Sequence, residues 1–223
     1  MHPGSSYDTN MMAPPRFGPA FRQQLYELFL WRRDVRRFRP DAIPADILTE
    51  VLRAAILAPS VGLSEPWRFV LVEAPQVRLQ VRQSFLSANQ EALSGYDGER
   101  ARLYASLKLE GLDQAPVQLA VYCDTQTAQG SGLGQRTMPE TITYSVVASI
   151  QTLWLAARAY GVGVGWVSIL EPVHVTAALQ VPVSWKLVAY LCLGYPAEES
   201  RQPTLAEAGW EQRRQVSEFV FRR

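Results

Sequence analysis

Apolar residues recur along the chain in two patterns, which predict two kinds of element. Apolar positions three and four residues apart predict amphipathic helices, and short apolar runs bounded by turn residues predict buried strands. The expected helices cover residues 21–31, 44–58, 76–93, 98–112, 144–160 and 172–179, and the expected strands cover 67–73, 117–123, 162–170 and 186–194. Alternation of helices with apolar strands predicts an α+β or α/β domain whose sheet is covered on both faces.

Two segments carry apolar residues that one small domain leaves without partners. The segment 144–160 is apolar nearly all round, which is typical of a helix buried in a core or at a large interface. Gly161 is a suitable residue to end it. The segment 216–221 (VSEFVF) alternates like a strand after a polar loop. We expect it to belong to an arm, about residues 198–223, that pairs with another subunit.

The composition indicates a folded protein. Hydrophobic residues make up 48% of the chain and charged residues 19%, which are proportions of a packed globular domain. Residues 1–18 are rich in Pro, Gly and Ser and predict a flexible tail, whereas residues 19–223 are expected to form one domain. We find no secretory signal pattern and no run of about 18 apolar residues, so a cytoplasmic protein is expected.

Charge and the scarce residue types narrow the possible functions. The formal net charge of +1 gives no global field that would attract nucleic acid or an anionic membrane, so an anion site must be a local cluster of arginines. The presence of only two histidines argues against a histidine-rich metal site. Cys123 and Cys192 lie in apolar runs and are expected to be core thiols in a reducing compartment.

The first candidate for chemistry is the segment 31–39 (WRRDVRRFR), which holds five arginines within eight residues. Such a cluster can present guanidinium groups to a phosphate. A basic run more often forms a solvated face, and spacing alone slightly favours that interpretation. Asp34 stands among the arginines either as a salt-bridge partner or as a placed functional carboxylate. The sequence leaves both alternatives open.

Two segments of small residues are further candidates. The segment 58–67 (APSVGLSEPW) could expose backbone N–H groups to a ligand, although most such loops only turn the chain. The segment 161–168 (GVGVGWVS) imitates a dinucleotide fingerprint, but its glycines open a strand and not a helix. They would permit close approach of a flat ligand or of another chain. Strand alternation predicts that Ser168 faces away from its neighbours, as a site residue or as an ordinary polar one.

The chain has no recognisable nucleophile or metal motif, so a cofactor is expected to supply the chemistry. Taken together, its motifs resemble the nitroreductase-like flavoproteins and, within them, the 5,6-dimethylbenzimidazole synthase family. Asp34 in RRDVR, together with SLKLEG and GVGWVSI, is the part most specific to the synthases. The similar segments lie in order between about residues 28 and 210: RRDVRRF (32–38), APSVGLSEPWRFVLV (58–72), GERARLYASLKLEG (98–111), RTMPET (136–141), YSVVASIQTLWLAARAYGVGVGWVSIL (144–170) and AYLCLGYP (189–196).

The resemblance implies a fold and a binding site. The fold would be α+β, a central and mostly antiparallel sheet flanked by helices, in an interlocked homodimer with FMN at the subunit interface. A lid at about residues 94–112 would exclude solvent and would carry Glu99 and Tyr104. The residues implied in FMN binding are Arg32, Arg33, Asp34, Val35, Arg36, Ser60, Gly62, Lys108, Gly165 and Ser168.

The resemblance also implies a reaction. Reduced FMN would be consumed as a substrate with O₂, giving 5,6-dimethylbenzimidazole and erythrose 4-phosphate for the lower ligand of cobalamin. A separate flavin reductase would supply the reduced FMN. Asp34 would transfer protons beside the ribityl chain, and Ser168 would offer a hydrogen bond near the flavin ring.

Three other functions stay open beside this one. They are an NAD(P)H-dependent nitroreductase or quinone reductase in which FMN cycles, a deiodinase-like relative, and a flavin-binding protein without activity. Asp34 argues against the first, because those enzymes usually have Ser at the matching place. The chain also departs from the expected pattern, with Glu65 in place of Gln, Arg68 in place of Asn and Gln135 in place of a basic residue. Arg68 is a possible partner for the Glu65 carboxylate.

Overall fold

The structure is a computed structural model, and it describes residues 14–106 and 111–223. Within these residues one antiparallel sheet forms, with the strand order β1-β2-β4-β3. The strands are β1 (Trp67–Leu71), β2 (Val117–Asp124), β3 (Gly163–Val167) and β4 (Trp185–Gly194). The helices are α1 (Pro19–Trp31), α2 (Ala45–Ala55), α3 (Pro75–Ser94), α4 (Gly98–Ser106), α5 (Gly111–Gln114), α6 (Thr141–Ala159), α7 (Pro172–Leu179) and α8 (Thr204–Glu207).

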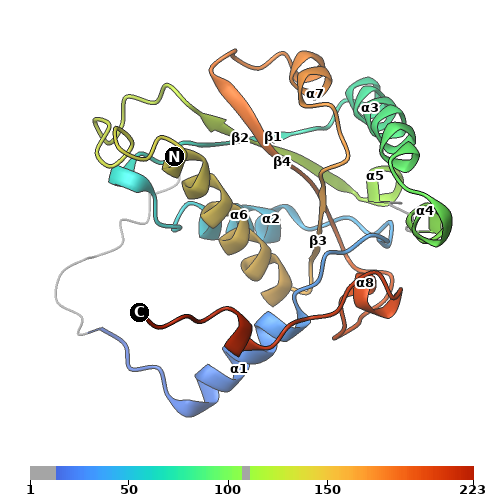
Figure 1. Ribbon diagram of the computed structural model, residues 1–223. Coiled ribbons are helices and arrows are strands. Elements are labelled where there is room, and N and C mark those ends of the chain that lie inside the picture. Colours follow the sequence, from blue (N-terminus) through green and yellow to red (C-terminus); the bar gives the residue numbers. More distant parts are fainter. Residues whose placement is uncertain (1–13, 107–110) are drawn as a thin grey trace.

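Helices cover both faces of the sheet, as the apolar strands predicted. Along β2, Leu119, Val121 and Cys123 pack into one core with residues of α2 and α6. Ala120 and Tyr122 point the other way, into a second core with residues of α3 and α7. This alternation follows from the two-residue period of a strand. Figure 1 shows α6 and α2 on one side of the sheet and α3 and α7 on the other.

The long helix α6 contributes one stripe of side chains to the core. Val146, Ile150, Leu153 and Ala157 recur at helical spacing and are fully buried. The helix ends at Ala159, and Gly161, just after the C-cap Tyr160, has a φ of 72° that glycine readily adopts. Elsewhere α6 stays exposed in the single chain, since Tyr144 and Val147 retain 57% and 40% of their accessible surface. The helix is therefore only partly a core element.

The two cysteines lie in the core, as expected. Both are buried and free, one in β2 and one in β4. Burial raises the pKa of the Cys192 thiol to about 12, and burial also raises the pKa of Cys123. Both thiols therefore stay protonated and unreactive near neutral pH. The described helices include none that is long and apolar enough to span a membrane.

Two expectations about local structure need correction, and a third is described only in part. The segment 216–221 contains a 3-10 turn at Val216–Glu218 and is exposed, so the strand that its alternation suggests does not form among the described residues, and its pairing with another subunit stays a prediction. Ser168 lies beyond the end of β3, so strand alternation does not assign its face. Of the helix expected over 98–112, the structure describes α4 and the start of α5, which are both helical, and Lys108 lies outside the described residues.

Candidate functional site

The arginine-rich segment leaves α1 as an extended chain and runs beside β3. Asp34 forms a parallel bridge with Val164, and the Val35 N–H donates to the Val164 carbonyl at 3.0 Å. The backbone N–H of Trp166 donates to Asp34 Oδ1 at 2.9 Å. The Asp34 carboxylate is therefore fixed by the backbone of β3 as well as by the chain that connects it to α1.

Glycines in β3 make this close approach possible. A Cβ atom on Gly165 would lie 2.1 Å from the Val35 carbonyl oxygen, and one on Gly163 would lie 2.7 Å from Val35 Cγ2. The sequence predicted a close approach at these glycines, by a flat ligand or another chain. The neighbour in the structure is the chain's own Val35. The assignment of Val35 and Gly165 to flavin binding stays a prediction.

Trp154 of α6 holds the same segment from the other side. Its indole N–H donates to the Arg33 carbonyl at 3.1 Å, and its ring centroid lies 5.1 Å from Arg32 Cζ. The second contact is a cation–π interaction. Sequence reasoning did not single out Trp154, because it belongs to an apolar helix in which nothing distinguishes it from other core residues.

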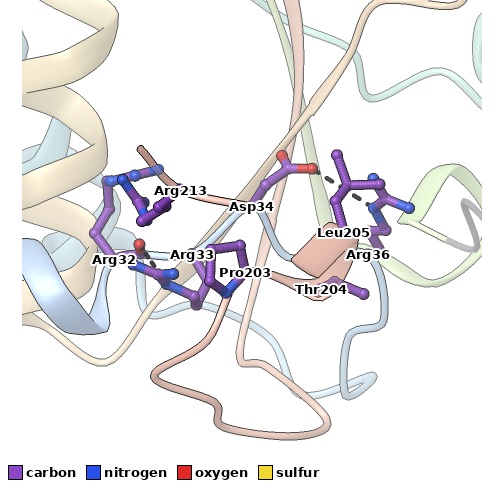
Figure 2. A pocket seen from close by; sticks show the side chains of 8 residues that line it. All are labelled: Arg32, Arg33, Asp34, Arg36, Pro203, Thr204, Leu205 and Arg213. Carbon is purple, nitrogen blue, oxygen red and sulfur yellow. Dashed lines mark hydrogen bonds and ion pairs between the residues drawn. The ribbon is translucent and has the colours of Figure 1, made fainter. Parts of the chain in front are cut away.

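Four arginines and Asp34 line a pocket of about 130 Å³, hereafter the arginine pocket. Figure 2 shows Arg32 and Arg213 on one side of it and the Asp34–Arg36 ion pair on the other. Liquid water occupies about 30 Å³ per molecule, so the volume admits a group of phosphate size. The lining residues are Arg32, Arg33, Asp34, Arg36, Pro203, Thr204, Leu205 and Arg213.

Arg213 and residues 203–205 come from the C-terminal segment, and sequence reasoning missed their role. Arg213 follows a polar loop with no motif, and local spacing does not reveal that it returns to the end of α1. The chain is held there by contacts such as Arg201 with Glu27, at 3.5 Å, and Arg201 over the Trp31 ring. Tertiary structure alone brings Arg213 to the arginine cluster.

The pocket's charges repel one another. Burial, followed by the charge of Arg213, lowers the pKa of Arg32. Burial lowers the pKa of Arg33, with further lowering by Arg32 and Arg213. Arginine stays protonated at neutral pH in any case. The repulsion therefore persists until an anion enters, and an oxyanion such as a phosphate ester is the ligand that guanidinium groups bind best.

Two charged side chains on the pocket wall, Arg36 and Asp34, are not fully paired. The Arg36 Nε–H is buried and has no hydrogen-bond acceptor among the described residues. It lies 3.7 Å from Asp34 Oδ2, which is an ion-pair distance beyond hydrogen-bond range. Burial raises the pKa of Asp34 despite the Trp166 N–H and the charges of Arg36 and Arg32. Burial thus opposes the negative charge of this carboxylate.

The predicted Ser60 loop lies at the other end of α6. The Val61 N–H donates to Ser145 Oγ at 3.0 Å, nine residues before Trp154, which is about 14 Å along a helix. The Ser60 hydroxyl accepts the Glu65 N–H at 3.2 Å. A Cβ on Gly62 would lie 2.9 Å from the Leu133 carbonyl, so that face meets the chain's own loop. Within a single chain, Ser60 and Gly62 therefore lie away from the arginine pocket.

The remaining predicted site residues are placed as follows. Ser168 is exposed, two residues beyond Trp166, and does not line the arginine pocket. The expected pairing of Arg68 with the Glu65 carboxylate is wrong. Arg68 Nη2 pairs with Asp124 at 2.9 Å, because the β1–β2 register brings the end of β2 beside it. The Glu65 carboxylate accepts the Gln129 side-chain N–H at 2.7 Å.

Comparison with known proteins identifies the class to which this fold and site belong. The Nitroreductase family model matches residues 29–195. The chain therefore belongs to the nitroreductase family. Its fold is similar to that of oxidized iodotyrosine deiodinase bound to FMN and 3-iodo-L-tyrosine, with a TM-score of 0.71 and 23% identity over 89% of this chain and 97% of that one.

Within that class the chain belongs with the 5,6-dimethylbenzimidazole synthases. It is 55% identical to the 5,6-dimethylbenzimidazole synthase of Rhodospirillum rubrum over 92% of this chain and 97% of the relative. It is 45% identical to the enzyme of that name from Rhodobacter capsulatus over 88% of this chain and 95% of the relative.

Proposed function

We propose that the protein is a 5,6-dimethylbenzimidazole synthase, in which reduced FMN reacts with O₂ to give 5,6-dimethylbenzimidazole, erythrose 4-phosphate and the remaining pyrimidine part of the flavin ring. Similarity to two synthases over nearly their whole length supports this assignment. The structural observation that carries it is the Asp34 carboxylate, held by the Trp166 N–H at the wall of the arginine pocket. Reduced FMN would be consumed as a substrate, and a separate flavin reductase would supply it.

The arginine pocket fits the phosphate of FMN. A phosphate dianion would accept hydrogen bonds from Arg32, Arg33 and Arg213 and relieve their mutual repulsion. It would also give the buried Arg36 Nε–H an acceptor. When bound, the reduced flavin supplies the electrons for reaction with O₂, and the protein binds it, orients it and handles protons.

Asp34 would be the residue that moves protons at the ribityl chain, which is joined to the phosphate. Its Oδ1 accepts the Trp166 N–H, so Oδ2 is the oxygen left to take a substrate proton. Burial raises the pKa of Asp34 towards the working pH, which suits a group that both accepts and returns a proton. Ser168, about 7 Å beyond Trp166 along an extended chain, would offer its exposed hydroxyl to the flavin ring.

A second copy of the chain would complete the flavin site. The Ser60 loop and the arginine pocket lie at opposite ends of α6, so two copies related by a twofold axis could bring one of each together. Apolar residues that remain exposed in one chain support such an interface. They include Tyr144 and Val147 on α6, Tyr26 and Phe29 on α1, and Val216, Phe219, Val220 and Phe221 in the C-terminal arm. Sedimentation in the presence of FMN should give a dimer, and a stable FMN-bound monomer would contradict this arrangement.

The proposed reaction is tested by mixing the purified protein with FMNH₂ and O₂ and measuring 5,6-dimethylbenzimidazole. Loss of FMN that matches the benzimidazole formed is the expected result. A parallel reaction receives NADH, O₂ and a trace of oxidised FMN without a reductase. Steady NADH oxidation there, with the flavin intact and no benzimidazole, would replace the proposal with a cycling flavin reductase. Bound FMNH₂ that survives air would indicate a flavin-binding protein without activity.

A further inference from the structure

The C-terminal segment 203–213, hereafter the strap, contacts two parts of the molecule. One part is the arginine pocket, which the strap lines with Pro203, Thr204, Leu205 and Arg213. The other is α4, where Trp210 of the strap lies against residues of that helix. Figure 1 shows α8, which belongs to the strap, between the end of the sheet and α4. A single short segment thus joins the phosphate site to the helix predicted to form the lid.

Backbone hydrogen bonds connect residues of the strap to one another. The Trp210 N–H donates to the Leu205 carbonyl at 2.8 Å, and the Ala208 N–H donates to the Thr204 carbonyl at 2.9 Å. Gly209 has a φ of 74°, which lets the chain turn back after α8. The backbone of Leu205, which lines the arginine pocket, is therefore hydrogen-bonded directly to that of Trp210.

Trp210 is the centre of an interaction cluster with the lid region. Arg100 Nη1 donates to the Trp210 carbonyl at 3.0 Å, and Arg100 Cζ lies 4.6 Å from the indole centroid. The Tyr96 ring meets the indole edge-on at 5.6 Å, and it stacks on Tyr104 at 5.0 Å. Cation–π and edge-to-face contacts of this kind are attractive and specific in geometry.

Outside the cluster around Trp210, the Tyr104 hydroxyl of α4 donates to Asn89 Oδ1 of α3 at 3.0 Å. None of residues 98–105 is buried, so the helix contributes no side chain to either core. The docked position of α4 therefore depends on contacts at its surface, which include those of Arg100 and Tyr104 with Trp210 and the hydrogen bond of Tyr104 to Asn89.

We infer that Trp210 and Arg100 are positioning residues that couple occupation of the arginine pocket to docking of α4. A phosphate bound by Arg213 would fix the strap, and the fixed strap would present Trp210 to Arg100. Coupling of this kind is reciprocal, so docking of α4 would strengthen phosphate binding by the same factor. The ligand chemistry is the phosphate monoester of a flavin, and in that respect the inference rests on the proposed function. Riboflavin, which lacks the phosphate, should leave α4 undocked.

Hydrogen exchange at the amides of residues 98–106 tests the coupling without turnover. Full-length protein is measured alone, with oxidised FMN and with riboflavin, each near saturation. FMN should slow exchange in α4 by about fivefold or more beyond the effect of riboflavin, at the lower end of usual coupling factors. Equal protection by both flavins would overturn the inference.

Two matched variants test whether the coupling depends on the contact between Arg100 and Trp210. Arg100→Gln removes the hydrogen bond and the cation–π contact with Trp210, whereas Arg102→Gln removes the same charge from the same helix. Arg100→Gln should abolish the FMN-specific protection and weaken FMN by a similar factor, and Arg102→Gln should do neither. Trp210→Phe should retain part of the effect and Trp210→Ala none. Equal behaviour of the two arginine variants would refute the assigned path.

The outcomes separate this inference from the proposed function. FMN-specific protection in a protein that forms no benzimidazole would overturn the proposed reaction alone. Benzimidazole formation with equal protection by both flavins would overturn the coupling alone. If FMN does not bind, inorganic phosphate becomes the probe, and a lack of protection of α4 at saturating phosphate then contradicts the coupling.

Discussion

The two walls of the arginine pocket differ in how the fold holds them. The wall formed by residues 32–36 is fixed by β3 on one side and by Trp154 of α6 on the other. The wall formed by the strap is held by its own hydrogen bonds and by half-buried surface contacts. A preorganised wall gives its binding energy without an ordering cost, whereas a loosely held wall loses part of its binding energy to ordering. The first wall therefore suits precise chemistry, and the second suits a response to the ligand.

The largest expected effect concerns the fixed wall and its carboxylate. Asp34→Asn keeps an oxygen that can accept the Trp166 N–H but removes the ability to take a proton. Removal of a general acid–base group usually lowers the rate by about 10²- to 10⁴-fold. Benzimidazole formation from FMNH₂ and O₂ should fall by this factor while reduced FMN still binds, so that the flavin reoxidises intact.

The control for this prediction is Ser168→Ala, which removes one hydrogen bond near the proposed ring position and should have a milder effect. An Asp34→Asn variant that forms benzimidazole at close to the parental rate would show that Asp34 only balances the arginines. The same rate in both variants would also argue against separate roles for the two residues.

The next expected effect compares one glycine in each wall. In Gly165→Ala the new Cβ would lie 2.1 Å from the Val35 carbonyl, so the fixed wall must move away from β3. Overpacking of this severity costs about 3 kcal/mol. In Gly209→Ala no atom lies within 4 Å of the new Cβ, and only the positive φ of 74° is unfavourable, at about 1–2 kcal/mol. Urea unfolding should rank the two variants in this order, and the reverse order would contradict the difference between the walls.

Much of the fold could be predicted from the sequence because it depends on local patterns. The apolar runs predicted β2 and β4, and the segment 144–160, which is apolar nearly all round, predicted α6. The arginine segment and Asp34 were also visible, since their residue types are unusual in one short stretch. Of the two interpretations of Asp34, the salt bridge is confirmed by its ion pair with Arg36, whereas its functional role stays a prediction for a residue that lines the pocket.

The remaining features depend on contacts between distant segments. Arg213 and Trp154 reach the pocket only through tertiary structure, and no local pattern marks them. The β1–β2 register decides that Arg68 pairs with Asp124, which the expected pairing with Glu65 did not take into account. The segment 216–221 has the alternation of a strand but no neighbouring strand in the part of the chain that the structure describes. Alternation predicts which residues would share a face, and it does not supply the partner.

A smaller effect concerns the arginines of the two walls. Arg33→Ala and Arg213→Ala each remove charge-assisted hydrogen bonds to phosphate, which contribute about 1.5–3 kcal/mol. FMN affinity should fall by roughly 10- to 100-fold in both variants, and more for Arg33 because its wall is already fixed. Titration calorimetry with FMN and riboflavin measures the difference, and riboflavin should be much less affected. Arg214→Ala is the matched control, since Arg214 does not line the pocket. Equal weakening of FMN and riboflavin would contradict phosphate binding here.

The smallest expected effect is on stability and follows from the raised pKa of Asp34. Burial disfavours the charged carboxylate in the folded protein, so folding raises the pKa above the ordinary value of 3.8. The sign follows by linkage: the ionised group destabilises the fold above its folded pKa, and this penalty vanishes below the unfolded pKa. Asp34→Asn removes the penalty, so without ligand the variant should unfold at a higher temperature than the parent at pH 7. The advantage should shrink as the pH is lowered towards 4, because Asp34 then becomes neutral in the parent as well. Thermal unfolding of both proteins across this pH range gives the comparison. A parent that is more stable than the variant at pH 7 would mean that the charges of Arg36 and Arg32 outweigh burial, and the carboxylate would then be a structural member of the fixed wall.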